Sequence, residues 1–246
     1  MLIRWKKSNR ENDTHPSSLK HLLIQFMQYQ NITQAVFIDR PNRFIAHAEV
    51  NGTVETVHVK NTGRCRELLI PGAEIWLTEP GTPGRKTRYD LIAVRKANGI
   101  LFNIDSQAPN AVVKEWLIKQ NFDKVIPEYR YGNSRIDFYM ERNGKCTLME
   151  VKGCTLEING IGYFPDAPTE RGTKHLRELI TAVQAGLGAI AAFVIQMDGV
   201  TEVRPNLAMD PAFGEALRDA ETAGVRLLML PCHVEPDSIK IADNEQ

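Results

Sequence analysis

The chain has 246 residues, which is enough for one large domain or two ordinary domains with a proper hydrophobic core. Its apolar fraction of 43% and charged fraction of 24% are those of a globular protein, and no apolar run reaches the roughly 18 residues of a membrane span. The formal net charge is zero, so the overall charge alone does not indicate a nucleic-acid-binding protein.

The N-terminal residues and the cysteines indicate a cytoplasmic protein. The first residues, MLIRWKKSNREND, are charged and lack the apolar segment of a secretory signal. The four cysteines, Cys65, Cys146, Cys154 and Cys232, are scattered and form no CxxC pair. A structural zinc site is therefore not expected, and reduced thiols fit the pattern.

Residues 1–35 are expected to form a helical extension. Pro16 stands near a helix start and is followed by an apolar stripe at helical spacing, made of Leu19, Leu22, Leu23 and Phe26. The stripe must be buried against something. Docking on the body of the chain is the simpler interpretation, and contact with a partner or within a homodimer is the alternative.

Residues 36–108 are expected to form a small β-barrel of the OB type. Short β-rich segments such as RFIAHAEV, ETVHVK, EIWLTEP and RYDLIAVR are separated by turn signals, among them Asn51-Gly52 and Pro71-Gly72. Barrels of this type often bind single-stranded nucleic acid through basic grooves. The candidate nucleic-acid-binding residues here are the basic residues Arg64, Arg66, Arg85, Lys86 and Arg88. The alternative is that these charges are simply solvated.

Residues 109–246 are expected to form a mixed α/β domain. PNAVVKEWLIKQ has a helical pattern, a second helix is expected over about 169–186, and GAIAAFVIQM suits a strand buried on both faces. A third helix has Asp210 as N-cap, Pro211 at its first position and Gly224 just past its end. VRLLMLPC then closes the domain as another buried strand, which gives an α/β layered fold.

The stretch SRIDFYMERNGKCTLMEVKG, residues 134–153, predicts a hairpin with Asn143-Gly144 at the turn. In that register the numbers of two paired residues add up to 287, so Phe138 faces Met149 on an apolar side. On the other side Asp137 lies opposite Glu150, although like charges so close destabilise a sheet. Lys152, two residues beyond Glu150, points to the same side.

This arrangement has the layout of a PD-(D/E)xK nuclease core, with a surface ion cluster as the alternative. Asp137, Glu150 and Lys152 are the candidate catalytic residues. Mg²⁺ or Mn²⁺ would take oxygen ligands from Asp137 and Glu150, and Glu115 on the preceding helix is a candidate outer ligand. Lys152 would position a water molecule and stabilise negative charge on a phosphate.

GYFPDAPTERGTKHLRELI, residues 162–180, carries a second cluster. Lys174 and His175 lie three and four residues beyond Arg171, so each shares a helix face with Arg171 near the helix N-terminus, where phosphates bind well. A solvated helix with Glu170–Lys174 and Lys174–Glu178 ion pairs is the alternative.

The chain resembles the sugar fermentation stimulation protein A family of bacteria and archaea. The resemblance rests on NTGR at 61–64, SRIDF at 134–138, EVKG at 150–153 and YFPDAPTERGTKHLREL at 163–179, and it covers roughly 36–234. It implies an OB-like domain joined to a PD-(D/E)xK-like domain, DNA binding without strong sequence preference, and a regulatory role in sugar (maltose) metabolism.

Two functions of different classes follow from these observations. The first is a DNA-binding protein with a Mg²⁺- or Mn²⁺-dependent nuclease site, and the second is a regulator that binds DNA without cutting it. Binding of single- or double-stranded DNA would rest mainly on backbone phosphates, and RNA fits the same residues. A sugar-processing enzyme fits less well, because the carboxylates stand beside a lysine and a basic helix, which suit an anionic substrate.

Overall fold

The computed structural model describes residues 27–132 and 134–242. The apolar stripe of residues 19–26 lies outside the described residues, so its predicted docking stays a prediction. Within the described residues, no helix has both the length and the apolar character needed to cross a membrane. The cysteines are free, and Cys65, Cys154 and Cys232 are buried.

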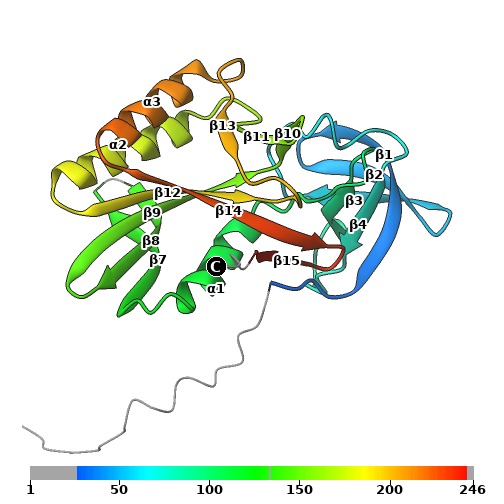
Figure 1. Cartoon of the computed structure of the whole chain (residues 1–246). Coiled ribbons are helices and arrows are strands. Elements are labelled where there is room, and N and C mark those ends of the chain that lie inside the picture. Colours follow the sequence, from blue (N-terminus) through cyan, green and yellow to red (C-terminus); the bar gives the residue numbers. More distant parts are fainter. Residues whose placement is uncertain (1–26, 133, 243–246) are drawn as a thin grey trace, which may run out of the picture.

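The N-terminal part is the predicted OB-like barrel (Figure 1). Its strands are β1 (Ile32–Asn42), β2 (Ile45–Val50), β3 (Thr53–Val59), β4 (Glu74–Thr78), β5 (Tyr89–Arg95) and the short β6 (Leu101–Asn103). They follow the order β3-β2-β1-β4-β5-β6, and a parallel pairing of β3 with β5 closes the first five into a barrel. Asn51 and Gly52 both have positive φ, as the tight β2–β3 turn requires.

The C-terminal part is the predicted α/β domain, built on a six-stranded sheet in the order β15-β14-β12-β9-β8-β7. Strands β9, β12 and β14 are parallel, and the outer strands pair antiparallel. The bounds of its strands are β7 (Lys124–Tyr131), β8 (Ser134–Arg142), β9 (Lys145–Cys154), β12 (Gly188–Ile195), β14 (Arg226–Glu235) and β15 (Ser238–Ile241).

Helices cover both faces of this sheet. Helix α1 (Ala108–Ile118) lies on one face, and α2 (Glu170–Gln184) and α3 (Pro211–Thr222) lie side by side on the other (Figure 1). Asp210 caps α3 by accepting from the backbone N–H of Phe213, and Gly224 follows the helix with φ of 98°. A small sheet is formed by β10 (Leu156–Ile158) and β11 (Ile161–Phe164), which follow β9, and by β13 (Val203–Pro205), which follows β12.

The β8–β9 hairpin has the predicted register. Asn143 and Gly144 have φ of 50° and 73°, and the pairs run from Arg142–Lys145 to Phe138–Met149. The predicted Asp137–Glu150 pair is not part of this ladder. Instead, a carboxylate oxygen of Asp137 accepts from the backbone N–H of Val151 at 2.7 Å. The two strands therefore end their regular pairing one residue before the acidic residues.

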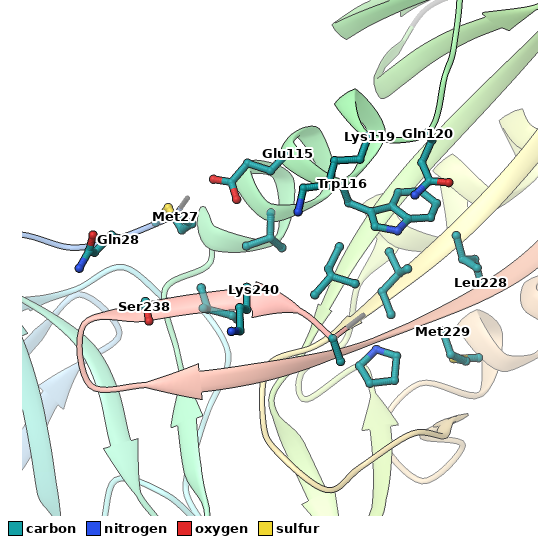
Figure 2. A pocket seen from close by; sticks show the side chains of 16 residues that line it. Met27, Gln28, Glu115, Trp116, Lys119, Gln120, Leu228, Met229, Ser238 and Lys240 are labelled. Atoms are coloured by element: carbon teal, nitrogen blue, oxygen red, sulfur yellow. The ribbon is translucent and has the colours of Figure 1, made fainter. Parts of the chain in front are cut away.

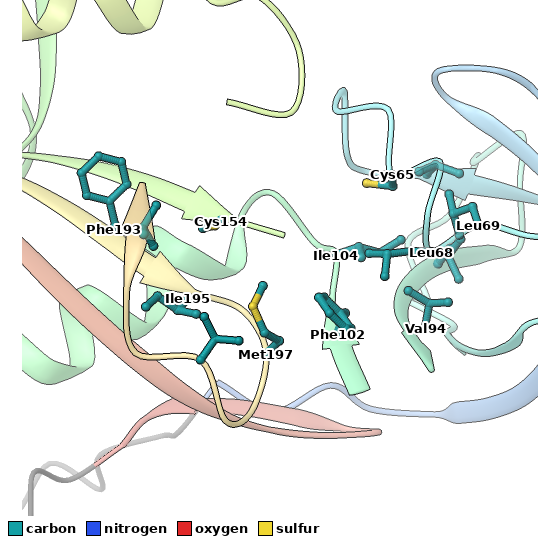
Figure 3. Close-up of a cluster of buried hydrophobic side chains, with 14 of the residues drawn as sticks. Cys65, Leu68, Leu69, Val94, Phe102, Ile104, Cys154, Phe193, Ile195 and Met197 are labelled. Atoms are coloured by element: carbon teal, nitrogen blue, oxygen red, sulfur yellow. The ribbon is translucent and has the colours of Figure 1, made fainter. Parts of the chain in front are cut away.

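One hydrophobic core runs through both parts of the molecule (Figure 3). Phe102 and Ile104 at the end of the barrel, together with Cys65, belong to the same buried cluster as Ile195 and Met197 at the end of β12. An ion pair between Lys96 Nζ and Glu157 Oε2, 2.5 Å apart, also crosses the junction. The barrel and the α/β domain are therefore held as one packed unit.

Candidate functional site

Glu150 is the centre of the candidate site. Strand β9 directs Glu150 and Lys152 to the face covered by α2, and the Glu150 side chain is only 4% exposed. Its Oε1 accepts from Lys152 Nζ at 2.6 Å and from His175 Nδ1 on α2. Its Oε2 is buried and has no hydrogen-bond partner among the described residues. A buried carboxylate oxygen without a partner is costly, so this atom can accept a further ligand.

Asp137 is fixed by two donors where β8 and β9 separate. One carboxylate oxygen accepts from Val151 N at 2.7 Å, and the other accepts from the side-chain amide of Asn110 on α1 at 2.8 Å. On the far side of β8, Glu128 in β7 has φ of 51°, so the regular pairing is interrupted there as well. Each oxygen retains a second lone pair, so Asp137 can still act as a ligand.

The pKa values of the two carboxylates move in opposite directions. Burial and the nearby charge of Glu150 raise the pKa of Asp137, although its two hydrogen bonds act against this. Burial also acts to raise the pKa of Glu150, but the hydrogen bond from His175 and the charge of Lys152 outweigh it, and the pKa is lowered. Asp137 is thus the carboxylate whose ionised form would gain most from an added cation.

Glu115 does not join this pair. It lines a separate cavity of about 690 Å³ between α1 and the β14–β15 hairpin, together with Trp116 and Lys240 (Figure 2). Glu115 is five residues beyond Asn110, which places the two side chains about 140° apart around α1. Since Asn110 is the residue that contacts Asp137, the structure does not bring the predicted outer ligand to the other two.

The three residues predicted on α2 have different environments. Arg171 and Lys174 are exposed and line an open hollow of about 540 Å³ with Ser134 and Arg135. His175 is buried at 4% exposure, contacts Glu150 and lines the base of the same hollow. Lys174 Nζ also lies 3.8 Å from Glu178 Oε1, so one of the two ion pairs considered as the alternative is present. The exposed cations of α2 therefore border the buried carboxylate site.

The predicted basic residues of the barrel are spread over two loops. Arg64 and Arg66 are exposed on the loop after β3, and Lys86 is exposed on the loop between β4 and β5. Arg85 pairs with the buried Asp90, and Arg88 pairs with Glu79 at 3.0 Å. Arg85 and Arg88 thus have local carboxylate partners.

Asn110 is the site residue that the sequence did not reveal. An asparagine in the first turns of a helix is common, and nothing near it in sequence marks a role. Its contact joins residues 27 positions apart and depends on how α1 packs against the sheet.

Among residues 27–132 and 134–242, no three His, Cys, Asp or Glu side chains are grouped so that they could hold a metal ion. For a cation at this site, the described residues thus offer the two carboxylates of Asp137 and Glu150.

Comparison with known proteins agrees with this architecture. The family model described as SfsA N-terminal OB domain matches residues 38–104, and the model described as sugar fermentation stimulation protein RE domain matches residues 107–238. A sugar fermentation stimulation protein homolog of Desulfitobacterium hafniense is 51% identical over 220 residues, which are 88% of this chain and 96% of the relative. A homolog from Clostridium beijerinckii is 50% identical over 221 residues, which are 88% of this chain and 97% of the relative.

A solved structure, Pyrococcus furiosus SfsA in complex with Ca²⁺, superposes with a TM-score of 0.76 at 28% identity. The match covers 88% of this chain and 95% of that one. The predicted resemblance, the OB-like barrel and the following α/β domain are thereby confirmed. On these matches, the chain belongs to the sugar fermentation stimulation protein (SfsA) family.

Proposed function

We propose that this protein binds nucleic acid through backbone phosphates and hydrolyses phosphodiester bonds at the Asp137–Glu150 site with a divalent cation. The observation that carries the proposal is the buried, unpartnered Oε2 of Glu150, beside a carboxylate whose pKa is raised and a lysine 2.6 Å from Oε1. Two carboxylate donors suit Mg²⁺ or Mn²⁺, which usually bind few protein carboxylates and keep several water ligands. The Ca²⁺ complex of the Pyrococcus furiosus relative supports the same class of cation.

Each residue has a separable task in this proposal. Asn110 and Val151 N hold Asp137 in one orientation, and His175 and Lys152 hold Glu150. Lys152 is close enough to the carboxylates to stabilise negative charge that develops on a phosphate. Arg171 and Lys174 would bind flanking phosphates from the rim of the site. When bound, the cation supplies a Lewis acid that polarises the phosphate and makes water more acidic.

A regulator that binds DNA without cutting it is the second candidate. It is favoured by the two side chains that already contact Glu150 Oε1, the Lys152 ammonium and the His175 ring, because they stabilise the buried carboxylate without any metal. In that case the carboxylates would be a structural ion cluster, and the exposed cations would carry the binding.

A cleavage assay separates the two candidates. End-labelled single- and double-stranded DNA is incubated with the intact protein and Mg²⁺ or Mn²⁺, beside samples with EDTA and samples of Lys152→Met. We expect cleavage that requires the cation and is lost in Lys152→Met, which keeps the length of the side chain but not its charge. Binding without cleavage in any of these cations would refute the nuclease and leave the regulator.

Arg171→Ala is expected to weaken DNA binding and to change its salt dependence. One phosphate contact fewer should reduce the slope of log affinity against log salt by about one. Arg226, exposed on β14 and separated from β9 by β12, provides the matched control as Arg226→Ala. Fluorescence anisotropy over a salt series measures both slopes. Equal slopes in Arg171→Ala and in the intact protein would remove Arg171 from the interface.

A further inference from the structure

A third cavity lies at the junction of the two parts, beside the candidate site. It has a volume of about 240 Å³ and is lined by the loop 61–63 of the barrel, by Gly153 and Thr155 at the end of β9, and by residues 163–169. Gly153 follows Lys152, and Pro109, which also lines the cavity, precedes Asn110. Because consecutive Cα atoms are about 3.8 Å apart, the wall formed by Gly153 and Pro109 lies next to Lys152 and Asn110, which contact the two carboxylates.

The barrel side of this junction pocket is fixed by hydrogen bonds. The Arg40 guanidinium donates to the carbonyl oxygens of Gly63 and Arg64, each at 3.0 Å, and of Asn61 at 2.6 Å. The N–H of Cys65 donates to Asp166 Oδ2 at 2.7 Å, which ties this loop to the opposite wall. The pocket is therefore formed before any ligand arrives, which lowers the entropic cost of binding.

At Gly63 this wall leaves no space for a side chain. A Cβ atom at Gly63 would lie 2.8 Å from Asn61 Oδ1 and 2.9 Å from Asp166 Oδ2, which is closer than such atoms approach in proteins. The glycine thus allows the loop and the Asp166 segment to meet closely, as the walls of a small pocket require.

The lining suits a base better than a phosphate. No lysine or arginine is among the lining residues, and the carboxylate of Asp166 would repel an anion. Tyr163 and Phe164 offer aromatic surface, and Asp166 and Thr62 offer an acceptor and a hydroxyl. Cations stand next to the pocket in sequence, since Arg64 follows Gly63 and Lys152 precedes Gly153. An aromatic pocket that repels anions and has cations at its edge matches a nucleotide whose phosphates stay outside.

From these features we infer that the junction pocket receives one unpaired base of the strand that is cut at the Asp137–Glu150 site. The inference rests on the proposed function and specifies its substrate. At about 240 Å³ the pocket is smaller than the roughly 300–1,000 Å³ of pockets for drug-sized ligands. A base pair cannot enter it, so the substrate has a single-stranded region, a frayed end or a base turned out of the stack.

An abasic scan tests the pocket directly. Short single-stranded DNAs, each with one abasic site at a different position, are bound in EDTA so that no cleavage occurs. Losing a stacked base should lower the affinity about fivefold or more at the position held in the pocket. Thr62→Trp should fill the pocket and make the affinity independent of that position. Thr62 is exposed, so the variant is expected to fold, and its thermal unfolding checks this.

Thr53→Trp is the matched control, because Thr53 is exposed at the other end of β3 from the pocket loop. It should retain the position dependence of the intact protein. The pocket assignment would be overturned by affinities that do not depend on the abasic position, or by a position dependence that Thr62→Trp leaves unchanged. Tight, salt-dependent binding in the same experiment would still support the proposed function. If the intact protein binds none of the DNAs, both the pocket assignment and the proposed function fail. Ribose oligonucleotides in the same scan distinguish RNA from DNA as the source of the base.

Discussion

Glu150→Gln is expected to reduce metal-dependent cleavage at least about a hundredfold while DNA binding in EDTA is kept. The reason lies in the two oxygens of Glu150. A glutamine Oε1 can still accept from Lys152 and His175, so the local packing is retained, but an amide group replaces the unpartnered Oε2. Loss of residues that merely support metal ligands already costs 10- to 100-fold, so loss of a direct ligand should cost no less.

Glu115→Gln provides the control for this experiment. It makes the same substitution at the other candidate ligand, which lies in the cavity between α1 and the β14–β15 hairpin (Figure 2). Initial rates of cleavage of a labelled oligonucleotide in Mn²⁺ measure both variants, and anisotropy in EDTA measures their binding. Glu115→Gln should cleave at the rate of the intact protein. Equal losses in the two variants, or full activity of Glu150→Gln, would contradict the site described here.

Phe102→Ala should destabilise the whole chain by about 3–5 kcal/mol, and both parts should unfold together. Phe102 is fully buried at the end of the barrel, in the cluster that contains Ile195 and Met197 of the α/β domain (Figure 3). Removing a buried aromatic ring leaves a cavity that rigid neighbours cannot fill. Because the cluster is shared, neither part retains a complete core when the other unfolds.

Urea unfolding followed at two tryptophans measures this coupling. Trp76 reports on the barrel and Trp116 on α1, in variants in which the other tryptophans are replaced by phenylalanine. The two transitions should coincide in the intact protein and shift together in Phe102→Ala. Phe44→Ala, at a side chain that is 51% exposed, should cost less than about 1 kcal/mol. Transitions that separate, with only the barrel destabilised, would show that the two parts fold independently.

The elements with strong local signals were predicted closely. The turn at Asn143-Gly144 set the β8–β9 register, because a type I′ turn needs positive φ at two adjacent residues. The limits of α3 followed from Asp210, Pro211 and Gly224, since each acts on its own or its neighbours' backbone. Strands with weaker signals, such as β7, β13 and β15, were not identified individually, because their pairing depends on neighbours distant in sequence.

The candidate site was predicted in part. The shared face of Glu150 and Lys152 follows from the two-residue period of a strand, and the structure brings their side chains into contact. The partners of the acidic residues did not follow, because His175 and Asn110 reach them from two helices on opposite faces of the sheet. Glu115 was expected beside them because it lies on the helix that precedes the hairpin. Its position was decided by which face of α1 is turned toward Asp137.

Local sequence is enough to predict the two successive folds, the hairpin and the face that carries Glu150 and Lys152, because turn chemistry and strand or helix periodicity act between near neighbours. Tertiary packing was needed to show that the barrel and the α/β domain share one core, that His175 is buried against Glu150, and that a pocket lies at the junction next to the carboxylate site. These features arise where segments far apart in the chain pack together. Such packing depends on the combined shape of many side chains, which no short stretch of sequence encodes.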